Sequence, residues 1–289
     1  FEKEKNQLKS RLSIITDANE PVEIRRVELE NLSQEEKILE VVCYFEPVLS
    51  RKEQDYAHQA FNNLFLIYDF DEETNSIIIK RKKREQNGQE IYLCANLSTN
   101  CETIGDLEYE IEKEKFFGRG NIGIAQMVKQ SKPFSKKIGL VTEPIVALKR
   151  TIKIKPNQKE KINLIIAVGE NKEEIKKEIQ KYKIEENIKK AVELSKAKNE
   201  AQNRYLRIKG TQIRDYQKMM SYIVFYNPTK KLNLEKLPKD KYKQSELWKY
   251  GISGDLPIIL VKIKDSNDAH VVKEVLKAYE FFRTKNLET

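Results

Sequence analysis

Short runs of apolar residues, separated by polar stretches, predict a series of β-strands over the first 170 residues. These runs are rich in β-branched and aromatic residues, and short turns containing Asn, Pro, Gly or Ser separate many of them. The predicted strands are residues 8–15, 22–29, 38–44, 61–70, 76–81, 91–97, 107–115, 145–154 and 161–168. So many consecutive strands with short polar connections predict an antiparallel β-sandwich.

The strand predicted at 22–29 changes phase part of the way along. Val22 and Ile24 share one face, whereas Val27 and Leu29 share the other. This pattern predicts either a bulge at 25–26 or a strand that is buried on both faces. Further along, the sequence Lys-Pro-Asn-Gln at 155–158 has the composition of a turn. It predicts a hairpin between the last two strands.

The hydrophobic period switches from strand to helix after Gly169. Residues 173–182 and 184–208 are rich in Lys, Glu and Ala and contain neither Pro nor Gly. Gly210 ends this region, and Thr211 is a candidate N-cap for the next helix, which Asn227-Pro228 would stop. That helix presents one apolar face, made of Ile213, Tyr216, Met220 and Val224.

A last amphipathic helix is predicted at 268–284. Its apolar positions are Val271, Val275, Ala278, Tyr279 and Phe282. The apolar run 258–263 precedes it and matches a solvent-facing helix poorly. The carboxyl-terminal part of the chain therefore carries more apolar surface than a few helices can bury.

Between these helical regions lies the stretch that carries the candidate chemistry, residues 247–258. It contains the chain's only tryptophan, Trp248, together with Tyr250, Ser253 and an isolated carboxylate, Asp255. An exposed Trp stacks on the apolar face of a pyranose ring, and a carboxylate accepts hydrogen bonds from its hydroxyls, so the pattern is typical of a sugar site. The alternative is a buried Trp beside a turn in which Asp255 caps a helix that begins at Leu256.

This stretch also carries a family resemblance. Trp-Lys-Tyr-Gly-Ile-Ser-Gly-Asp-Leu-Pro-Ile resembles the segment that leads into the helical barrel of glycoside hydrolase family 94, particularly its cyclic β-1,2-glucan synthases and 1,2-β-oligoglucan phosphorylases. Residues 22–27, 58–65, 117–120 and 268–285 are similar to the family in the same order, so the resemblance extends over nearly the whole chain.

The resemblance implies an architecture. We expect a β-super-sandwich domain at 1–170, a helical linker at 171–209 and the first helices of a truncated (α/α)6 catalytic barrel at 210–289. The chain begins without Met at Phe1, and we interpret it as a fragment of a larger protein. The run 258–263 would then line the barrel core.

The resemblance also implies an activity, inverting phosphorolysis of a β-1,2-glucosidic bond or the reverse glucosyl transfer. Inorganic phosphate is the co-substrate, no cofactor is needed, and the catalytic acid lies outside this chain. By the same resemblance, we expect Asp255, Trp248, Tyr250 and Ser253 to bind the substrate. The turn in this chain lacks an arginine that the related disaccharide phosphorylases have. The expected partner is a β-glucan or gluco-oligosaccharide, and family phosphorylases are commonly homodimers. The alternative function is a stand-alone, non-catalytic carbohydrate-binding sandwich.

Charge, hydropathy and cysteine content bear on three other classes: nucleic acid binders, membrane proteins and metalloproteins. The net charge is +9, but Lys and Glu interleave, which is typical of a solvated surface and does not favour nucleic acid binding. The exception is the basic run 80–84, which we interpret as an exposed hairpin loop. No stretch reaches the roughly 18 apolar residues of a membrane span. Three cysteines, Cys43, Cys94 and Cys101, form no CxxC pair, which disfavours a metal site and suits a reducing, cytoplasmic compartment.

Two further features could indicate a cofactor site or a catalytic site. Residues 118–123 match GxGxxG, but no βαβ spacing surrounds them, so a surface or interdomain loop is favoured over a dinucleotide site. In the resembling family, Phe-x-Gly-Arg-Gly recurs in a sandwich loop that borders the active site. His58, just before the predicted strand 61–70, has no GxSxG nearby, which disfavours a hydrolytic triad.

Overall fold

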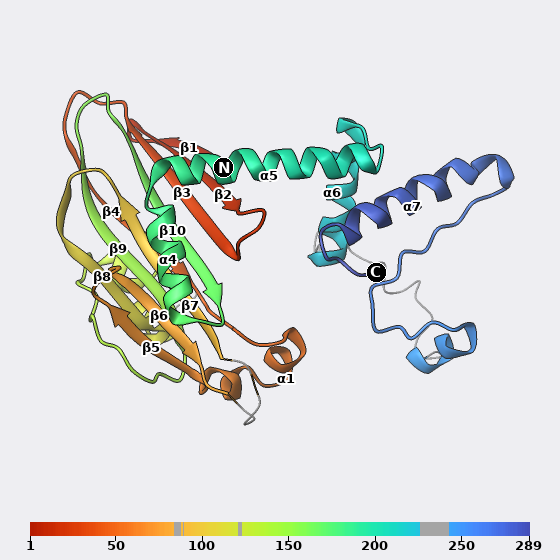
Figure 1. The fold of residues 1–289 in the computed structure, drawn as a ribbon, viewed down its shortest axis with the longest axis horizontal. Helices are drawn as coiled ribbons and strands as arrows, with labels where there is room; N and C mark the ends of the chain where they lie inside the picture. Colours follow the sequence, from red (N-terminus) through yellow and green to blue (C-terminus); the bar gives the residue numbers. More distant parts are fainter. Residues whose placement is uncertain (84–87, 89, 121–122, 226–242) are drawn as a thin grey trace. The chain divides into compact units, whose positions relative to one another are not determined.

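The computed structural model describes residues 1–83, 88, 90–120, 123–225 and 243–289. Its contacts group the chain into two compact units, Phe1–Ser195 and Lys196–Thr289. The first unit holds all of the strands that are described, and the second holds only helices and connecting segments (Figure 1). The predicted boundaries between sandwich, linker and barrel, after residues 170 and 209, stay a prediction.

The first unit contains two antiparallel sheets, as the strand pattern predicted. The seven-stranded sheet has the order β1-β2-β3-β10-β7-β6-β5 and the three-stranded sheet the order β4-β9-β8. The larger sheet comprises β1 (Glu2–Lys5), β2 (Leu8–Thr16), β3 (Val22–Asn31), β10 (Lys159–Gly169), β7 (Ile91–Thr99), β6 (Ser76–Arg81) and β5 (Leu66–Asp71). The smaller comprises β4 (Lys37–Phe45), β9 (Pro144–Ile154) and β8 (Thr103–Glu112).

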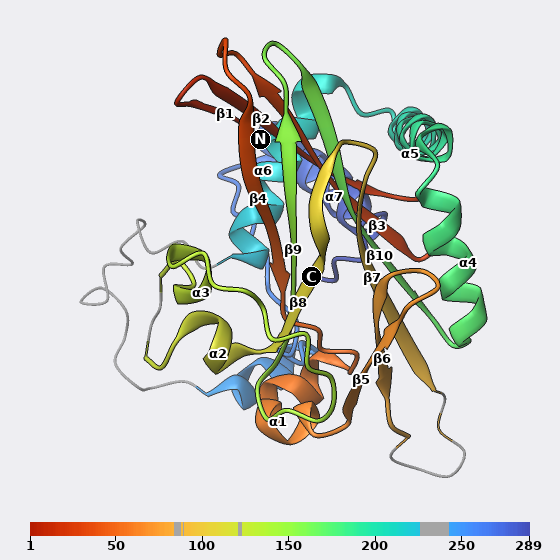
Figure 2. The same cartoon turned by 90° about the vertical axis from the view of Figure 1, so that its left-hand side faces the viewer.

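Each sheet is covered on both faces, so the unit is built in four layers (Figures 1 and 2). The main core joins the facing sides of the two sheets and includes Ile77 and Leu97 from one sheet and Leu148 and Ile152 from the other. Helices α4 (Lys172–Tyr182) and α5 (Glu185–Tyr205) supply the cover for the outer face of the large sheet. Helices α2 (Lys113–Phe117) and α3 (Gln126–Lys129), with Phe134, cover the outer face of the small sheet.

The phase change in β3 comes from burial on both faces. Val22 and Ile24 pack under α4 and α5, whereas Val27 and Leu29 contact the core between the sheets. The strand pairs residue for residue with β2 and with β10 throughout, so the register contains no bulge. Of the two predicted explanations, the doubly buried strand is confirmed.

The predicted hairpin at 155–158 is wrong. The turn itself forms, with Asn157 in the left-handed region and the Gln158 N–H donating to the Lys155 carbonyl at 3.2 Å. It joins strands of different sheets, because β9 pairs with β4 and β8, whereas β10 pairs with β3 and β7. Consecutive strands that both carry apolar residues on two faces can enter separate layers, and turn composition alone does not distinguish this crossover from a hairpin.

The strand predicted at 61–70 begins too early. Residues 52–63 form helix α1 (Lys52–Asn63), which is kinked at His58, and strand β5 starts only at Leu66. Asn62 anchors the helix by accepting a hydrogen bond at its Oδ1 from Nη2 of the buried Arg81, at 3.0 Å. The aromatic side chain of Phe61 is 47% exposed, so it contributes to no strand core.

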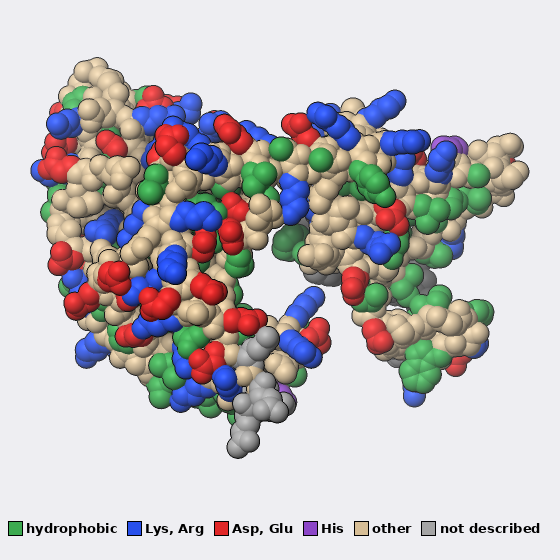
Figure 3. Space-filling model, viewed as in Figure 1, with side chains coloured by type: hydrophobic (Ala, Val, Ile, Leu, Met, Phe, Trp, Pro, Cys, Tyr) green, Lys and Arg blue, Asp and Glu red, His purple; other side chains and the backbone are tan. Residues whose placement is uncertain are grey.

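The basic run at 80–84 is only partly a loop. Lys80 and Arg81 are the last residues of β6, and Lys80 pairs with Glu90 at 2.9 Å. Lys82 and Lys83 are exposed after the strand, and Arg84 lies outside the described residues. Over the face drawn in Figure 3, basic and acidic side chains are intermixed, as expected from the interleaved sequence.

The second unit is built on helices α6 (Gly210–Val224) and α7 (Ala269–Arg283). Tyr216, Ala278, Phe281 and Phe282 form its buried core. Helix α6 begins two residues earlier than predicted, with Lys209 and not Thr211 at the N-cap, and the predicted stop at Asn227-Pro228 lies outside the described residues. No described helix is long and apolar enough to span a membrane.

Helix α4 is fixed to the β2–β3 turn by a hydrogen bond from the Tyr182 hydroxyl to Asp17 Oδ2 at 2.7 Å. Burial alone would raise the pKa of Asp17, but hydrogen bonds from the Asn19 N–H and from Tyr182 hold this pKa below its ordinary value. A carboxyl whose pKa is lowered by folding stabilises the fold above its unfolded pKa of about 4, and this contribution is lost as the pH falls through the lower folded pKa. We expect Asp17→Asn to lower the free energy of unfolding by about 1–2 kcal/mol at pH 7 and by less at pH 3, as measured by urea unfolding.

Candidate functional site

The candidate site centres on the loop that the sequence singled out. Residues 244–250 form a short 3-10 helix, η2 (Gln244–Tyr250), and Gly251 ends it in the left-handed region with φ 71°. The chain then turns back on the helix at Gly254, whose φ is 75°. A Cβ atom at Gly254 would lie only 2.9 Å from Gln244 Cγ and 3.0 Å from Leu247 Cδ1, so glycine permits this close return.

Hydrogen bonds inside the loop connect three of the four predicted residues. Gln244 Nε2 donates to the Ser253 carbonyl at 2.9 Å and to Asp255 Oδ1 at 3.0 Å. The Trp248 indole N–H donates to the same carbonyl at 3.2 Å, and the Asp255 backbone N–H donates to Ser253 Oγ at 3.3 Å. Tyr250 is outside this network, and its ring lies 5.3 Å from Lys249 Nζ. The loop therefore holds Trp248, Ser253 and Asp255 in a fixed mutual arrangement.

The aromatic side chains of the loop are presented to solvent. Trp248 is 65% exposed and Tyr250 is 72% exposed, and Asp255 is also exposed. The alternative of a buried Trp is therefore wrong for the unit as described. Exposed aromatic rings beside a carboxylate and a hydroxyl give the loop the groups that bind sugar rings by stacking and by hydrogen bonds to their hydroxyls.

The alternative role of Asp255 as a helix cap is also wrong, because no helix follows it. Residues 256–265 are in irregular, extended backbone. Pro257 supplies no N–H, and the β-branched run that follows disfavours helix. From Ile258 to Val261 exposed and half-buried residues alternate, as in an extended segment. The Asp255 carboxylate is left at the surface, with Oδ1 held by Gln244.

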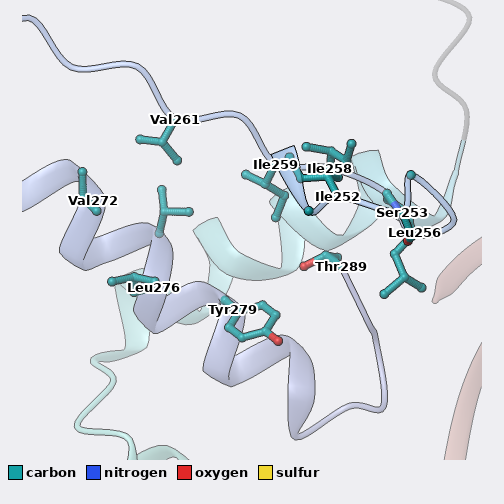
Figure 4. Close-up of a pocket in the computed structure, with 14 residues that line it drawn as sticks. Ile252, Ser253, Leu256, Ile258, Ile259, Val261, Val272, Leu276, Tyr279 and Thr289 are labelled. Atoms are coloured by element: carbon teal, nitrogen blue, oxygen red, sulfur yellow. The ribbon is translucent and has the colours of Figure 1, made fainter. Parts of the chain in front are cut away.

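An apolar groove lies beside the loop and was not predicted. Its volume is about 460 Å³, and the extended segment and helix α7 form its walls (Figure 4). Lining residues include Ile252, Leu256, Ile259, Val261, Val272, Leu276 and Tyr279. Ser253 also lines the groove, whereas Trp248, Tyr250 and Asp255 do not. With so few polar groups, the groove itself is suited to apolar contacts and not to binding sugar hydroxyls.

Helix α7 shows why the groove escaped the sequence pattern. Ala278, Phe281 and Phe282 are buried against α6, whereas the predicted core residue Val271 is 39% exposed. Val272, Leu276 and Tyr279 instead line the groove as a second apolar stripe. These residues are four and three positions apart, so the sequence could have predicted a second apolar stripe on the helix. It does not show which of the two stripes contacts α6.

The two weaker motifs lie in the first unit. Gly118 ends helix α2 with φ 83°, and the loop continues through Arg119 and Gly120; residues 121–122 lie outside the described part. His58 lies at the kink in α1 and is exposed. Within the described residues, no cluster of His, Cys, Asp and Glu side chains has the arrangement of a metal site.

Gly254 provides a direct test of the loop geometry, because Trp248 is the only tryptophan in the chain. Gly251 and Gly254 both have positive φ, but a Cβ at Gly251 would meet no atom within 4 Å. Both alanine substitutions therefore cost about 1 kcal/mol of backbone strain, and only Gly254→Ala adds a steric clash. We expect acrylamide to quench Trp248 fluorescence more strongly in Gly254→Ala than in Gly251→Ala. Equal quenching in the two variants would mean that the loop does not pack as described.

The sandwich architecture agrees with what is found among known proteins. Residues 1–185 match the family model described as the glycosyl hydrolase 94 supersandwich domain. Because this match covers more than half of the chain, the chain belongs to glycosyl hydrolase family 94. The expected family and its supersandwich fold are thus confirmed.

Similarity to individual proteins was also found. Over 288 residues, or 99% of its length, the chain is 25% identical to "Cyclic beta-(1,2)-glucan synthase NdvB" of Rhizobium meliloti (strain 1021). The chain spans only 10% of the length of that protein. A solved structure described as a putative kojibiose phosphorylase from the human microbiome aligns with a TM-score of 0.35 and 14% identity, over 66% of this chain and 21% of that one.

Proposed function

We propose that this chain is part of a family 94 enzyme that acts on β-1,2-glucan, by inverting phosphorolysis or by glucosyl transfer between glucan and phosphate. The supporting observation is the combination of the supersandwich match over residues 1–185 with similarity along 99% of the chain to a protein named as a cyclic β-(1,2)-glucan synthase. That similarity covers the Trp248 loop as well as the sandwich. The β-1,2 linkage is that of the glucan made by the relative, and the phosphorolysis follows from the family resemblance.

The proposed reaction breaks one bond and forms one. A protonated carboxylic acid gives its proton to the glycosidic oxygen, and the bond between this oxygen and the anomeric carbon breaks. A phosphate oxygen attacks the same carbon from the opposite face, so a β-glucoside yields α-glucose 1-phosphate. Inverting hydrolases use a second carboxylate to activate water. Phosphate is already anionic, so one acid is enough, and we place that acid outside this chain.

In this proposal the Trp248 loop binds the glucan. Trp248 and Tyr250 stack on the apolar faces of glucose rings, and Asp255 and Ser253 hydrogen bond to ring hydroxyls. The support is that both rings are exposed and that Gln244 already orients Asp255 through Oδ1. Such groups give binding and orientation, and they move no proton themselves. We place the reaction in the cytoplasm, where free thiols such as those of Cys43, Cys94 and Cys101 persist.

The alternative is a non-catalytic sandwich that only binds carbohydrate. The whole protein encoded by the reading frame that contains this chain distinguishes the two, when supplied with glucose 1-phosphate and a β-1,2-gluco-oligosaccharide acceptor. We expect phosphate release with this acceptor and much less with β-1,3- or β-1,4-linked acceptors. Binding of the oligosaccharide without phosphate release would favour the non-catalytic alternative.

A further inference from the structure

A second, polar pocket lies in the first unit, beside the junction of α4 and α5. This junction lies over the outer face of the large sheet (Figures 1 and 2). Its volume is about 230 Å³. Strand β10, the end of β7 and the start of α5 contribute its lining, which contains the lysines Lys159, Lys161, Lys183 and Lys189 and the acids Glu160 and Glu185. Four cations against two carboxylates give the lining a net positive charge.

Lys183 is a partly buried lysine of this pocket. It is half-buried between α4 and α5, and its Nζ donates to the Thr74 carbonyl at 2.6 Å. No carboxylate among the described residues lies within ion-pair distance of it. Burial lowers the pKa of Lys183, and the nearby Arg150 lowers it further, whereas Asp71 raises it. An ammonium that is partly removed from water without an anionic partner is costly, and an anion in the pocket would offset that cost.

Asn163 adds an oriented, unused donor to the same pocket. The residue is only 7% exposed and lines the pocket. Its Oδ1 accepts a hydrogen bond at 3.0 Å from Nε of the buried Arg26, whose Nη2 is held at 2.6 Å from Glu185 Oε2. This contact fixes the amide plane. Among the described residues the Nδ2 group has no partner, yet it is not among the atoms sealed from solvent. The amide therefore offers its N–H groups to the pocket.

We propose that this pocket binds a small phosphoryl oxyanion, either inorganic phosphate or the phosphoryl group of a sugar phosphate. Lysine ammonium groups and an amide N–H are donors that suit phosphate oxygens. Lys161 and Lys189 already contact Glu185 and Glu186, but each ammonium has three N–H groups and retains donors for a ligand. No aromatic residue lines the pocket, so it lacks the stacking surface of a neutral sugar site.

Isothermal titration of the 289-residue chain with inorganic phosphate and with glucose 1-phosphate tests this site and distinguishes the two sources. We expect Lys183→Gln to weaken phosphate binding about tenfold or more, because a charge-assisted contact is lost. Lys159→Gln removes a charge that is exposed to solvent, so we expect a smaller loss. Lys190→Gln is the matched control, since Lys190 is an exposed lysine on α5 that does not line the pocket. The affinity of this variant for phosphate should be unchanged.

The side-chain amide of Asn163 gives a readout that needs no lysine variant to fold. In an NMR titration its two N–H resonances, assigned by their absence from Asn163→Asp, should shift with phosphate. Unshifted resonances, or an equal loss of affinity in Lys190→Gln, would overturn the assignment, as would displacement of phosphate by a neutral gluco-oligosaccharide. These experiments measure binding and not catalysis. A chain that does not bind phosphate in this pocket would not contradict the proposed function, and a protein that does not catalyse phosphorolysis would not contradict this site.

Discussion

Replacing Lys149 with alanine should lower the free energy of unfolding of the sandwich by about 3 kcal/mol. The Lys149 side chain on β9 is only 4% exposed, and its ammonium lies 3.1 Å from Glu108 and 3.5 Å from Glu40. It also donates to the Lys132 carbonyl at 3.1 Å and lies 4.9 Å from the centre of the Phe134 ring. The substitution would leave two carboxylates facing each other without a cation. Hydrogen exchange of the β9 amides in the 289-residue chain measures the loss.

Lys153 on the same strand is the matched control. It pairs with Glu102 at 2.9 Å, but the Lys153 and Glu102 side chains are 31% and 57% exposed. Exposed pairs contribute little, so Lys153→Ala should cost far less stability than Lys149→Ala. If the two variants lost the same stability, the buried ammonium would not hold the sandwich together as its contacts indicate.

In the whole protein, Asp255→Ala should lower kcat/KM for β-1,2-gluco-oligosaccharide about 100-fold, because a carboxylate that holds glucose hydroxyls contributes to binding in both the ground state and the transition state. Most of the change should be in KM, since Asp255 is assigned to binding and not to proton transfer. Initial rates of phosphorolysis over a range of oligosaccharide concentrations separate KM from kcat.

Two other variants distinguish direct contact from a purely structural role. Gln244→Ala removes the hydrogen bond to Asp255 but keeps its carboxylate, and we expect only a several-fold loss of kcat/KM. Asp215→Ala removes an exposed carboxylate on α6 and should leave the kinetics unchanged. An effect of Gln244→Ala as large as that of Asp255→Ala would show that Asp255 acts by shaping the loop and does not contact the sugar.

Much of the sandwich was predictable because its strands are short runs of β-branched and other apolar residues that lie between polar turns. Ser76–Arg81 matches the predicted strand at both ends, and β9 and β10 match within two residues. Strand β1 was missed because Glu2–Lys5 contains only charged, exposed residues and lies at the sheet edge, where no burial pattern is imposed. The assignment of strands to two sheets depends on contacts between distant residues, which turn composition does not reveal.

Helix α1 was partly mispredicted as a strand, because the prediction relied on the strand propensity of individual residues. Phe61 and Phe65 have strand propensity, and the prediction therefore extended β5 backward through them. The observed helix is anchored by a polar contact between Asn62 and Arg81, residues 19 positions apart. Neither hydrophobic period nor propensity encodes such an anchor, so the helix could not be predicted from the pattern.

The candidate loop was identifiable from sequence, whereas its surroundings were not. A single Trp, two glycines and an isolated Asp marked residues 247–258, and the structure joins Trp248, Ser253 and Asp255 through Gln244 and the Ser253 carbonyl. The part played by Gln244 was missed because a glutamine among lysines carries no motif. The groove was missed because it depends on how the extended segment lies against α7.

The most direct test of the proposed activity is the anomeric configuration of the product. The whole protein would be incubated with β-1,2-gluco-oligosaccharide and inorganic phosphate, and the sugar phosphate followed from the first turnovers by proton and phosphorus NMR. Inverting phosphorolysis predicts α-glucose 1-phosphate as the first product, formed only when phosphate is present. Release of free glucose without phosphate, or β-glucose 1-phosphate as the first product, would contradict the proposed reaction.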